Sequence, residues 1–245
     1  MADLRKIFEN EKVANAIAMA IEEGELSVDD FSSEIKKQPK GEMSIFLAVI
    51  QRMNGIQRWN KSQSIKAEYL HEHSFVVGVI CYFLGLHRER IHGKSDNFSP
   101  EKLAILGLFH DIGESLVEDT NSLIKHRDTE INALVKEVES KILTKLSVTV
   151  DEEIRDRLEE YIVQSSQDQV YKDLVKAADE ISAYIKTVQE LRSNNGDFLR
   201  ANKSIGQKIS TYFEKYPEVK FLFERYTPAF SLTIDELADL LPMKN

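Results

Sequence analysis

Hydrophobic residues recur every three or four positions along almost the whole chain, which is the spacing of amphipathic helices. Val13, Ile17 and Ile21 follow this spacing near the start, and Phe46 and Ile50 follow it further on. The predicted helices cover residues 3–23, 43–53, 69–86, 99–111, 128–146, 151–163, 170–193, 197–214, 217–224 and 233–241. The pattern therefore predicts an all-α protein.

The clearest interruption of this pattern is the polar stretch 37–41, Lys-Gln-Pro-Lys-Gly, which contains Pro39 and Gly41. Proline and glycine are the residues that most often mark a boundary between elements. We therefore expect a small helical N-terminal extension over residues 1–41, followed by one helical domain over residues 42–245.

The composition supports a helical, folded protein. Gly and Pro number only 10 and 5 among 245 residues, which is few for the turns of a β-sandwich or barrel. Apolar residues make up 42% of the chain, enough to form a core. The single cysteine, Cys81, excludes an internal disulfide and a thiolate zinc knuckle.

The charge balance narrows the range of partners. With 41 acidic and 32 basic residues, the formal net charge is -9, which disfavours duplex nucleic acid because phosphate contacts dominate such binding. A small anionic substrate held in a local basic pocket remains compatible with this charge.

No segment is predicted to enter a membrane. Residues 1–10 are charged, unlike a signal peptide. The longest uncharged apolar run, residues 75–86, is too short to span a bilayer, which takes about 20 residues. We therefore expect a cytoplasmic protein without a membrane partner.

Two histidines and two aspartates are the candidates for chemistry. His73 and His110 each share a helix face with apolar residues, and Asp111 follows His110 directly. Asp179, with Val175 four residues before it, is also directed toward the core. Buried carboxylates need a compensating charge, and two imidazoles with two carboxylates suit a first-row divalent metal. Residue types and spacing alone also allow ordinary hydrogen-bonded core histidines.

Several local motifs carry a resemblance to a known family. They are Arg58-Trp59, residues 71–74 (His-Glu-His-Ser), residues 110–114 (His-Asp-Ile-Gly-Glu), residues 175–179 (Val-Lys-Ala-Ala-Asp), residues 183–186 (Ala-Tyr-Ile-Lys) and residues 228–232 (Pro-Ala-Phe-Ser-Leu). In order and separation they resemble the HD superfamily of phosphohydrolases, and within it the YfbR-like 5'-deoxynucleotidases. The resemblance covers residues 43–245 and implies an HD-domain helical bundle.

The resemblance also implies roles for individual residues. The ligands of a single divalent cation, such as cobalt or manganese, would be His73, His110, Asp111 and Asp179. Glu114 would lie beside the scissile phosphate, and Asp119 would be a second catalytic carboxylate that acts through the water network. Arg58 would bind the phosphate, and Trp59 would pack on the sugar and disfavour a 2'-hydroxyl.

Lys125 falls where the family often has a further lysine, although Asn121, Ser122 and Leu123 replace the prolines expected around it. The implied reaction is metal-dependent hydrolysis of deoxyribonucleoside 5'-monophosphates, and the family likeness also suggests a homodimer. One alternative is a deoxynucleoside triphosphate triphosphohydrolase, which needs more basic residues than Arg58 and Lys125. Another alternative is a non-catalytic helical binding module.

Overall fold

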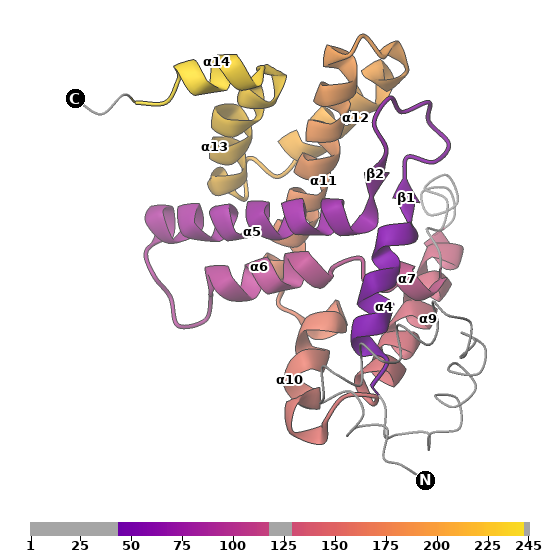
Figure 1. Ribbon diagram of the computed structural model, residues 1–245. Helices are drawn as coiled ribbons and strands as arrows, with labels where there is room; N and C mark the ends of the chain where they lie inside the picture. Colours follow the sequence, from indigo (N-terminus) through magenta and orange to yellow (C-terminus); the bar gives the residue numbers. More distant parts are fainter. Residues whose placement is uncertain (1–43, 118–128, 243–245) are drawn as a thin grey trace, which may run out of the picture. The chain divides into compact units, whose positions relative to one another are not determined.

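The computed structural model describes residues 44–117 and 129–242, and the predicted extension over residues 1–41 lies outside them. The described chain is almost entirely helical, as predicted, and Figure 1 shows the arrangement. Its α-helices are α4 (Phe46–Arg52), α5 (Leu70–His92), α6 (Pro100–Phe109), α7 (Glu114–Val117), α9 (Thr129–Ser147), α10 (Glu152–Ile162), α11 (Gln169–Arg192), α12 (Leu199–Ser210), α13 (Pro217–Tyr226) and α14 (Ile234–Asp239). Short 3-10 turns are η1 (Met53–Gly55), η2 (Gln164–Ser166), η3 (Gly196–Phe198) and η4 (Thr227–Ser231).

Helices α5 and α6 lie side by side and form the most extensive helix pair (Figure 1). Glycine permits their close approach: a Cβ atom at Gly85 would lie 2.6 Å from the Pro100 Cα atom. At Gly107, a Cβ atom would lie 2.7 Å from the Cys81 Sγ atom. The two helices therefore touch at positions where any larger side chain would force them apart.

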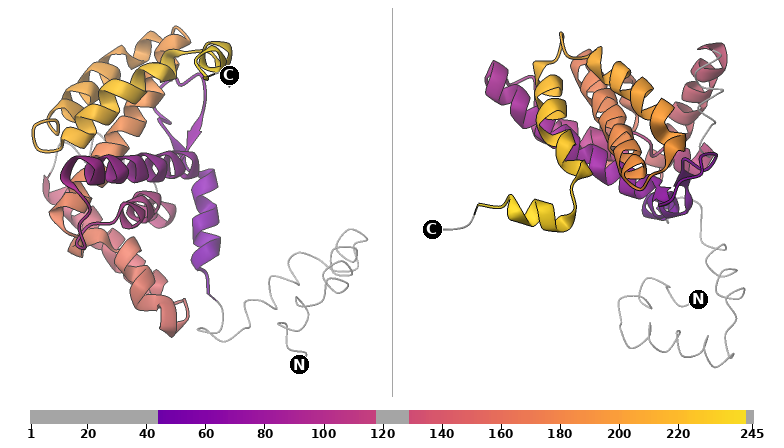
Figure 2. Two further views of the ribbon diagram at one scale, coloured as in Figure 1. Left: turned by 90° about the vertical axis from the view of Figure 1, so that its left-hand side faces the viewer. Right: turned by 90° about the horizontal axis from the view of Figure 1, so that it is seen from above.

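Helix α11 packs against both α5 and α6, and also against α12. Figure 2 shows α11, α12 and α13 gathered beside α5. The main hydrophobic core lies between these helices and includes the fully buried residues Leu84, Leu103, Leu174 and Ile181. This core fixes α11 relative to the α5–α6 pair.

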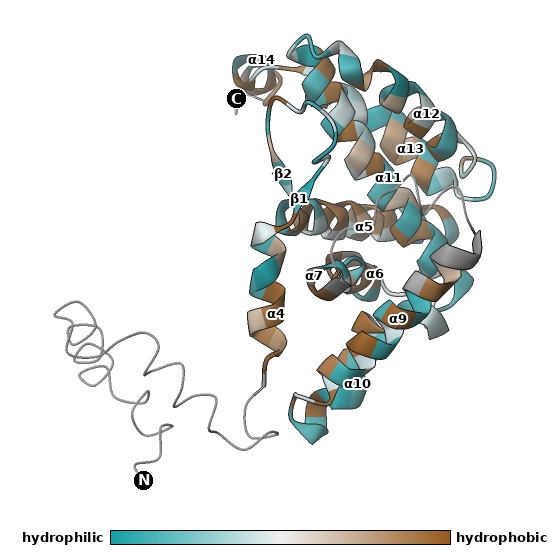
Figure 3. Cartoon of the chain, turned by 90° about the vertical axis from the view of Figure 1, so that its right-hand side faces the viewer, coloured by the Kyte–Doolittle hydropathy of each residue, from teal (hydrophilic) through white to brown (hydrophobic). Residues whose placement is uncertain are grey.

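A second, smaller core joins α4 to α9 and α10, with Phe46, Ile112, Leu143 and Ile162 among its buried members. Figure 3 shows both hydrophobic and hydrophilic residues along α9 and α10. Burial of one face and solvation of the other is the expected behaviour of an amphipathic helix.

One feature was absent from the sequence-based prediction. Strands β1 (Gln57–Arg58) and β2 (Glu68–Tyr69) pair antiparallel, with Arg58 opposite Glu68. They form a small hairpin immediately before α5.

No helix in the described part of the chain is long and apolar enough to cross a membrane.

Candidate metal centre and substrate pocket

His73 lies in the first turns of α5, with its side chain almost completely buried. Its Nδ1 atom is 3.1 Å from the Ser182 hydroxyl on α11. In the tautomer in which Nδ1 donates to Ser182, the Nε2 atom keeps its lone pair and can bind a cation.

His110 and Asp111 follow the end of α6. This helix begins at Pro100, and the Ser99 hydroxyl caps it by accepting a hydrogen bond from the Lys102 amide. His110 Nδ1 lies 2.8 Å from the Gly107 carbonyl oxygen. A carbonyl can only accept, so Nδ1 carries the proton and Nε2 is available as a ligand atom.

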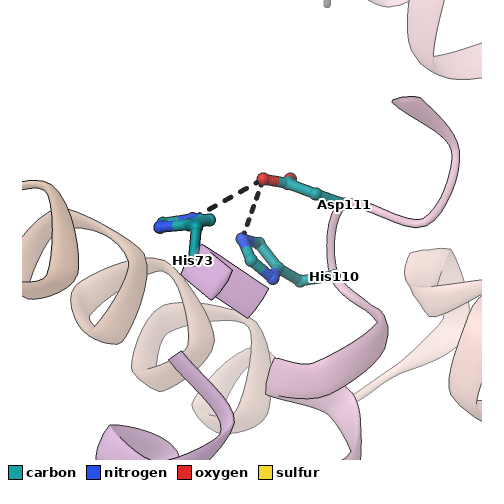
Figure 4. Close-up of side chains that lie close together, drawn as sticks. All are labelled: His73, His110 and Asp111. Carbon is teal, nitrogen blue, oxygen red and sulfur yellow. Dashed lines mark ion pairs between the residues drawn. The ribbon is translucent and has the colours of Figure 1, made fainter. Parts of the chain in front are cut away.

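The four predicted ligands come together. His110 Nε2 is 3.0 Å from Asp111 Oδ2, and His73 Nε2 is 3.7 Å from the same oxygen. Asp179 Oδ1, from α11, lies 3.2 Å from His73 Nε2 and 4.0 Å from His110 Nε2. Figure 4 shows both imidazole rings beside the Asp111 carboxylate.

This group fits a metal ion. Ligand atoms of His73, His110 and Asp111 all lie within 4.8 Å of one another, and Asp179 adds a second carboxylate. Both Nε2 atoms are buried, and neither makes a hydrogen bond to any described residue. Buried polar atoms are normally satisfied, so these two lone pairs call for a ligand. Imidazole and carboxylate donors are those that first-row divalent metals accept.

The pKa values of the carboxylates reflect their surroundings. Burial acts to raise the pKa of Asp111, but the charge of the adjacent His110 outweighs it, and the pKa is lowered. Burial likewise opposes ionisation of Asp179, whose pKa is nevertheless held well below its usual value by His73, Lys176 and His110. Both groups therefore remain ionised at neutral pH.

The pKa values of the two histidines move in opposite directions. Burial and the nearby Arg58 guanidinium lower the pKa of His73. Burial also acts to lower the pKa of His110, but Asp111 and Asp179 outweigh it and raise the pKa.

Arg58, at the end of β1, points into the same group. Its Nη1 atom is 3.3 Å from Asp111 Oδ2, and its Nη2 atom is 3.9 Å from Asp179 Oδ1. Glu68, across the hairpin, accepts a hydrogen bond from Arg58 Nε at 3.2 Å. Glu68 was missed by the sequence analysis, because its contact depends on a hairpin too short to recognise.

Trp59 is held rigidly beside Arg58. Its backbone has φ 55°, a left-handed conformation that is strained for a bulky residue. The indole Nε1 donates to Glu68 at 3.0 Å, and the ring lies 5.3 Å from that of Phe198. Such strain persists only where the surroundings enforce it, and it clusters at functional sites. The contacts anchor the ring, while its predicted role at a sugar stays a prediction.

Glu114, the first residue of α7, is buried and lines a cavity of about 630 Å³ together with His110, Asp111 and Asp179. Three lysines that the sequence analysis did not single out line the same cavity: Lys136, Lys172 and Lys176. Lys176 Nζ lies 2.6 Å from Asp179 Oδ2 and so holds the carboxylate oxygen opposite to the one facing His73. Asp119 and Lys125 lie outside the described residues.

Comparison with known proteins identifies the class of fold. A solved HD-domain phosphohydrolase from Listeria innocua matches with a TM-score of 0.65 and 16% identity, covering 76% of this chain and 87% of that chain. A cyanophage S-2L HD phosphohydrolase, solved with dA and one catalytic Zn²⁺ ion, matches with a TM-score of 0.54 and 16% identity over 74% of this chain and 95% of that one. The fold is thus that of the HD-domain phosphohydrolases.

Sequence comparison is more specific. The family model described as 5'-deoxynucleotidase YfbR-like matches residues 45–230. A 5'-deoxynucleotidase of Photobacterium profundum is 33% identical over 201 residues, which covers 80% of this chain and 100% of the relative. The chain therefore belongs to the YfbR-like family of 5'-deoxynucleotidases. The predicted family, helical HD-domain fold and phosphoric monoester hydrolase class are confirmed.

Proposed function

We propose that the chain hydrolyses deoxyribonucleoside 5'-monophosphates to a deoxyribonucleoside and orthophosphate, using one divalent cation held by His73, His110, Asp111 and Asp179. The observation that carries this proposal is the pair of buried Nε2 atoms without hydrogen bonds, which face two ionised carboxylates. Membership of the 5'-deoxynucleotidase family supports the substrate class.

When bound, the cation polarises a phosphoryl oxygen and lowers the pKa of a water molecule. Arg58 binds the phosphate, since a guanidinium offers two parallel N–H donors that match two phosphoryl oxygens. Its position 3.3 Å from Asp111 supports this role, because a phosphate near the cation lies within its reach.

Glu114 supplies the proton for the leaving group. As the water oxygen attacks phosphorus, the bond from phosphorus to the 5'-oxygen breaks and its electron pair stays on that oxygen. The proton that the water loses restores the acid form of Glu114 after Glu114 has donated its own. A carboxylic acid beside the phosphate can protonate the 5'-oxygen as the bond breaks. The burial of Glu114 in the wall of the same cavity supports this assignment. Asp119 acts through the water network in this proposal.

Trp59 selects the sugar by packing on deoxyribose and leaving no room for a 2'-hydroxyl. The fixed backbone and the hydrogen bond to Glu68 support this role, because selection between two sugars needs a rigid wall. Lys125 contributes to substrate binding in the same proposal.

The basic lining of the cavity bears on the triphosphohydrolase alternative, because Lys136, Lys172 and Lys176 add positive charge near the candidate metal site. Two of these lysines are already engaged, however. Lys176 pairs with Asp179 at 2.6 Å, and Lys172 donates to the Ser165 carbonyl at 2.5 Å. Of the three lysines, this leaves Lys136 for the substrate beside Arg58, and so few positive charges favour a monophosphate over a triphosphate.

A non-catalytic binding module fits less well. Such a scaffold has no need for an arginine and a buried glutamate beside a set of metal ligands.

We further propose a cytoplasmic location and a homodimer, which rest on the sequence and the family likeness.

Product analysis tests the proposed reaction. The full-length protein is loaded with cobalt or manganese and given dAMP, AMP and dATP in parallel, with EDTA as the metal-free control. The expected result is orthophosphate from dAMP, little from AMP and none with EDTA. Tripolyphosphate from dATP with dAMP untouched would establish the triphosphohydrolase instead, and no product from any substrate would favour the binding module.

A further inference from the structure

One face of α11 carries a line of buried or half-buried polar residues that extends beyond the candidate metal site. Asp179, Ser182, Lys186 and Glu190 are spaced three, four and four residues apart, so they lie on the same face of the helix. The first two belong to the metal site described above. Lys186 and Glu190 are only 4% and 2% exposed, although burial of charged groups is costly.

Glu190 binds the loop between the two strands of the hairpin. Its carboxylate accepts hydrogen bonds from the Ser64 hydroxyl at 2.8 Å and from the backbone amides of Ile65 at 2.9 Å and Lys66 at 3.2 Å. It also accepts one from Asn195 Nδ2 at 2.9 Å. One carboxylate thus satisfies several donors of a loop that is more than a hundred residues away in the sequence.

Lys186 completes this anchor. Its Nζ atom donates to Glu190 at 2.5 Å and to the backbone carbonyl of Lys66 at 2.5 Å. The charge of Glu190 is therefore balanced, and the loop is held through both a carbonyl and two amides. Hydrogen bonds to charged partners are stronger than those between neutral groups.

One further contact, from just beyond the end of α11, holds the loop: Asn195 Nδ2 also donates to the Gln63 carbonyl at 2.7 Å. Of residues 60–66, all are exposed except Ser64, which is half-buried. Even the loop's hydrophobic residue, Ile65, is 63% exposed. Because residues 60–66 bury so little apolar surface, the position of this part of the loop depends on polar contacts rather than on packing.

The hairpin that this loop closes carries Arg58, which lies beside Asp111, and Glu68, which accepts hydrogen bonds from both Arg58 and Trp59. We infer that Glu190 and Lys186 are positioning residues for substrate, which hold the hairpin so that Arg58 and Trp59 meet the nucleotide. This inference rests on the proposed function for its effect on turnover, while the anchoring of the hairpin can be measured without substrate.

A matched pair of double variants tests the inference. Lys186→Met with Glu190→Ala removes every acceptor at position 190 without leaving a buried charge unpaired. Lys186→Met with Glu190→Gln also removes both charges but keeps one acceptor oxygen for the loop. The two proteins differ in whether residue 190 can accept a hydrogen bond from the loop, and Ala is also the smaller side chain. Glu224→Ala is the control, because Glu224 also pairs with a lysine four residues away, Lys220, but on the exposed surface of α13.

Hydrogen exchange of the full-length protein reports on the anchor directly. In the Ala double variant, we expect amides of residues 57–69 to exchange about tenfold faster than in the wild type, because local opening no longer breaks strong hydrogen bonds. The Gln double variant should lie between the two. Exchange in α5 and α11 outside this contact should stay at the wild-type rate, which also shows that the variant is folded.

Binding and kinetics separate positioning from general damage. We expect KM for dAMP to rise about tenfold in the Ala double variant, and the preference for dAMP over AMP to fall, since small displacements of binding groups are costly. The dissociation constant for Mn²⁺ should change much less than the roughly 10- to 100-fold seen when groups supporting metal ligands are lost.

Wild-type exchange across the hairpin in the Ala double variant would overturn the inference. So would faster exchange accompanied by unchanged KM and sugar preference, or equal behaviour of the Ala and Gln double variants. If the wild-type protein turns over no deoxynucleotide, the proposed function fails by itself, and the exchange and Mn²⁺ measurements still decide whether Glu190 anchors the hairpin.

Discussion

His73 Nδ1 and the Ser182 hydroxyl lie 3.1 Å apart, which joins α5 to α11 directly behind the candidate metal site. The hydrogen bond fixes the orientation of a buried imidazole whose other nitrogen faces Asp179. Outer groups of this kind orient the ligand and set its tautomer.

Removal of that hydroxyl should weaken metal binding. For Ser182→Ala we expect the affinity for Mn²⁺ or Co²⁺ to fall by about 10- to 100-fold, because His73 loses the partner that orients it. Isothermal titration calorimetry measures the dissociation constant. Ser204→Ala is the control, since Ser204 is exposed on α12 and donates only to the Ala201 carbonyl. An unchanged affinity in Ser182→Ala would show that the contact has no part in metal binding.

Loss of a ligand should have a larger effect than loss of its support. Asp111→Ala should abolish metal content and turnover together. The loss of metal affinity should exceed the roughly 100-fold that removal of a supporting group can cost. Metal analysis of the purified variant and assays with dAMP at saturating metal measure the two effects. If activity survives in Asp111→Ala, the assignment of the metal site is wrong.

Trp59 provides a test of sugar selection. Trp59→Ala should narrow the ratio of kcat/KM for dAMP to that for AMP, because the wall proposed to exclude the 2'-hydroxyl is gone. Discrimination by exclusion of one small group is worth about 10- to 200-fold, so the ratio should fall by up to this factor. A ratio equal to that of the wild type would place sugar selection elsewhere in the pocket.

The close contact of α5 and α6 predicts an effect on stability. Gly85→Ala should lower the free energy of unfolding by about 1–3 kcal/mol, because the new Cβ atom meets the backbone of Pro100 at 2.6 Å. This cost exceeds the gain in helix propensity from Gly to Ala, which is about 1 kcal/mol or less. Urea titration measures the difference. Gly196→Ala serves as the control, since a Cβ atom there meets nothing within 4 Å, and equal stability of Gly85→Ala and wild type would contradict the prediction.

The ionisation of Glu190 should make the free energy of unfolding depend on pH. Burial acts to raise its pKa, but Lys186, the Ile65 amide, Asn195 and Ser64 outweigh burial and lower it. A lowered folded-state pKa stabilises the protein above the unfolded-state value, about pH 4.3 for glutamate, and this contribution is lost as pH falls.

The variant with Lys186→Met and Glu190→Gln tests this dependence, because residue 190 no longer titrates. Between pH 7 and pH 4, its free energy of unfolding should fall by less than that of the wild type, when both are measured by urea titration in EDTA. An equal fall in the two proteins would show that the ionised form of Glu190 does not stabilise the fold.

Much of the fold follows from the spacing of apolar residues. Helix α11 was predicted at residues 170–193 and occupies 169–192, and α6 was located by Ser99 and Pro100. These signals are local, so they can be recognised in the sequence. Helix α5 continues to His92, six residues beyond its predicted end at residue 86. The prediction ended too early because the last turns are polar and lack the apolar spacing.

The hairpin could not be predicted in this way. Its strands have two residues each, too few to show alternation, and Gln57, Arg58 and Glu68 are polar. The convergence of His73, His110, Asp111 and Asp179 was expected from their apolar surroundings and from the family motifs. Glu68 and Glu190 were missed because their partners are recognised only in three dimensions, in the case of Glu190 about 125 residues away.

The polar face of α11 has a consequence for changes in chain length. Asp179 and Glu190 are eleven residues apart, close to three full turns, so they share a direction. An insertion or deletion of one residue between them would rotate one against the other by about 100°. Either the cation ligand or the hairpin anchor would then point away from its partner. The length of this stretch therefore cannot vary, whereas the exposed loop it anchors is where extra residues can be accommodated.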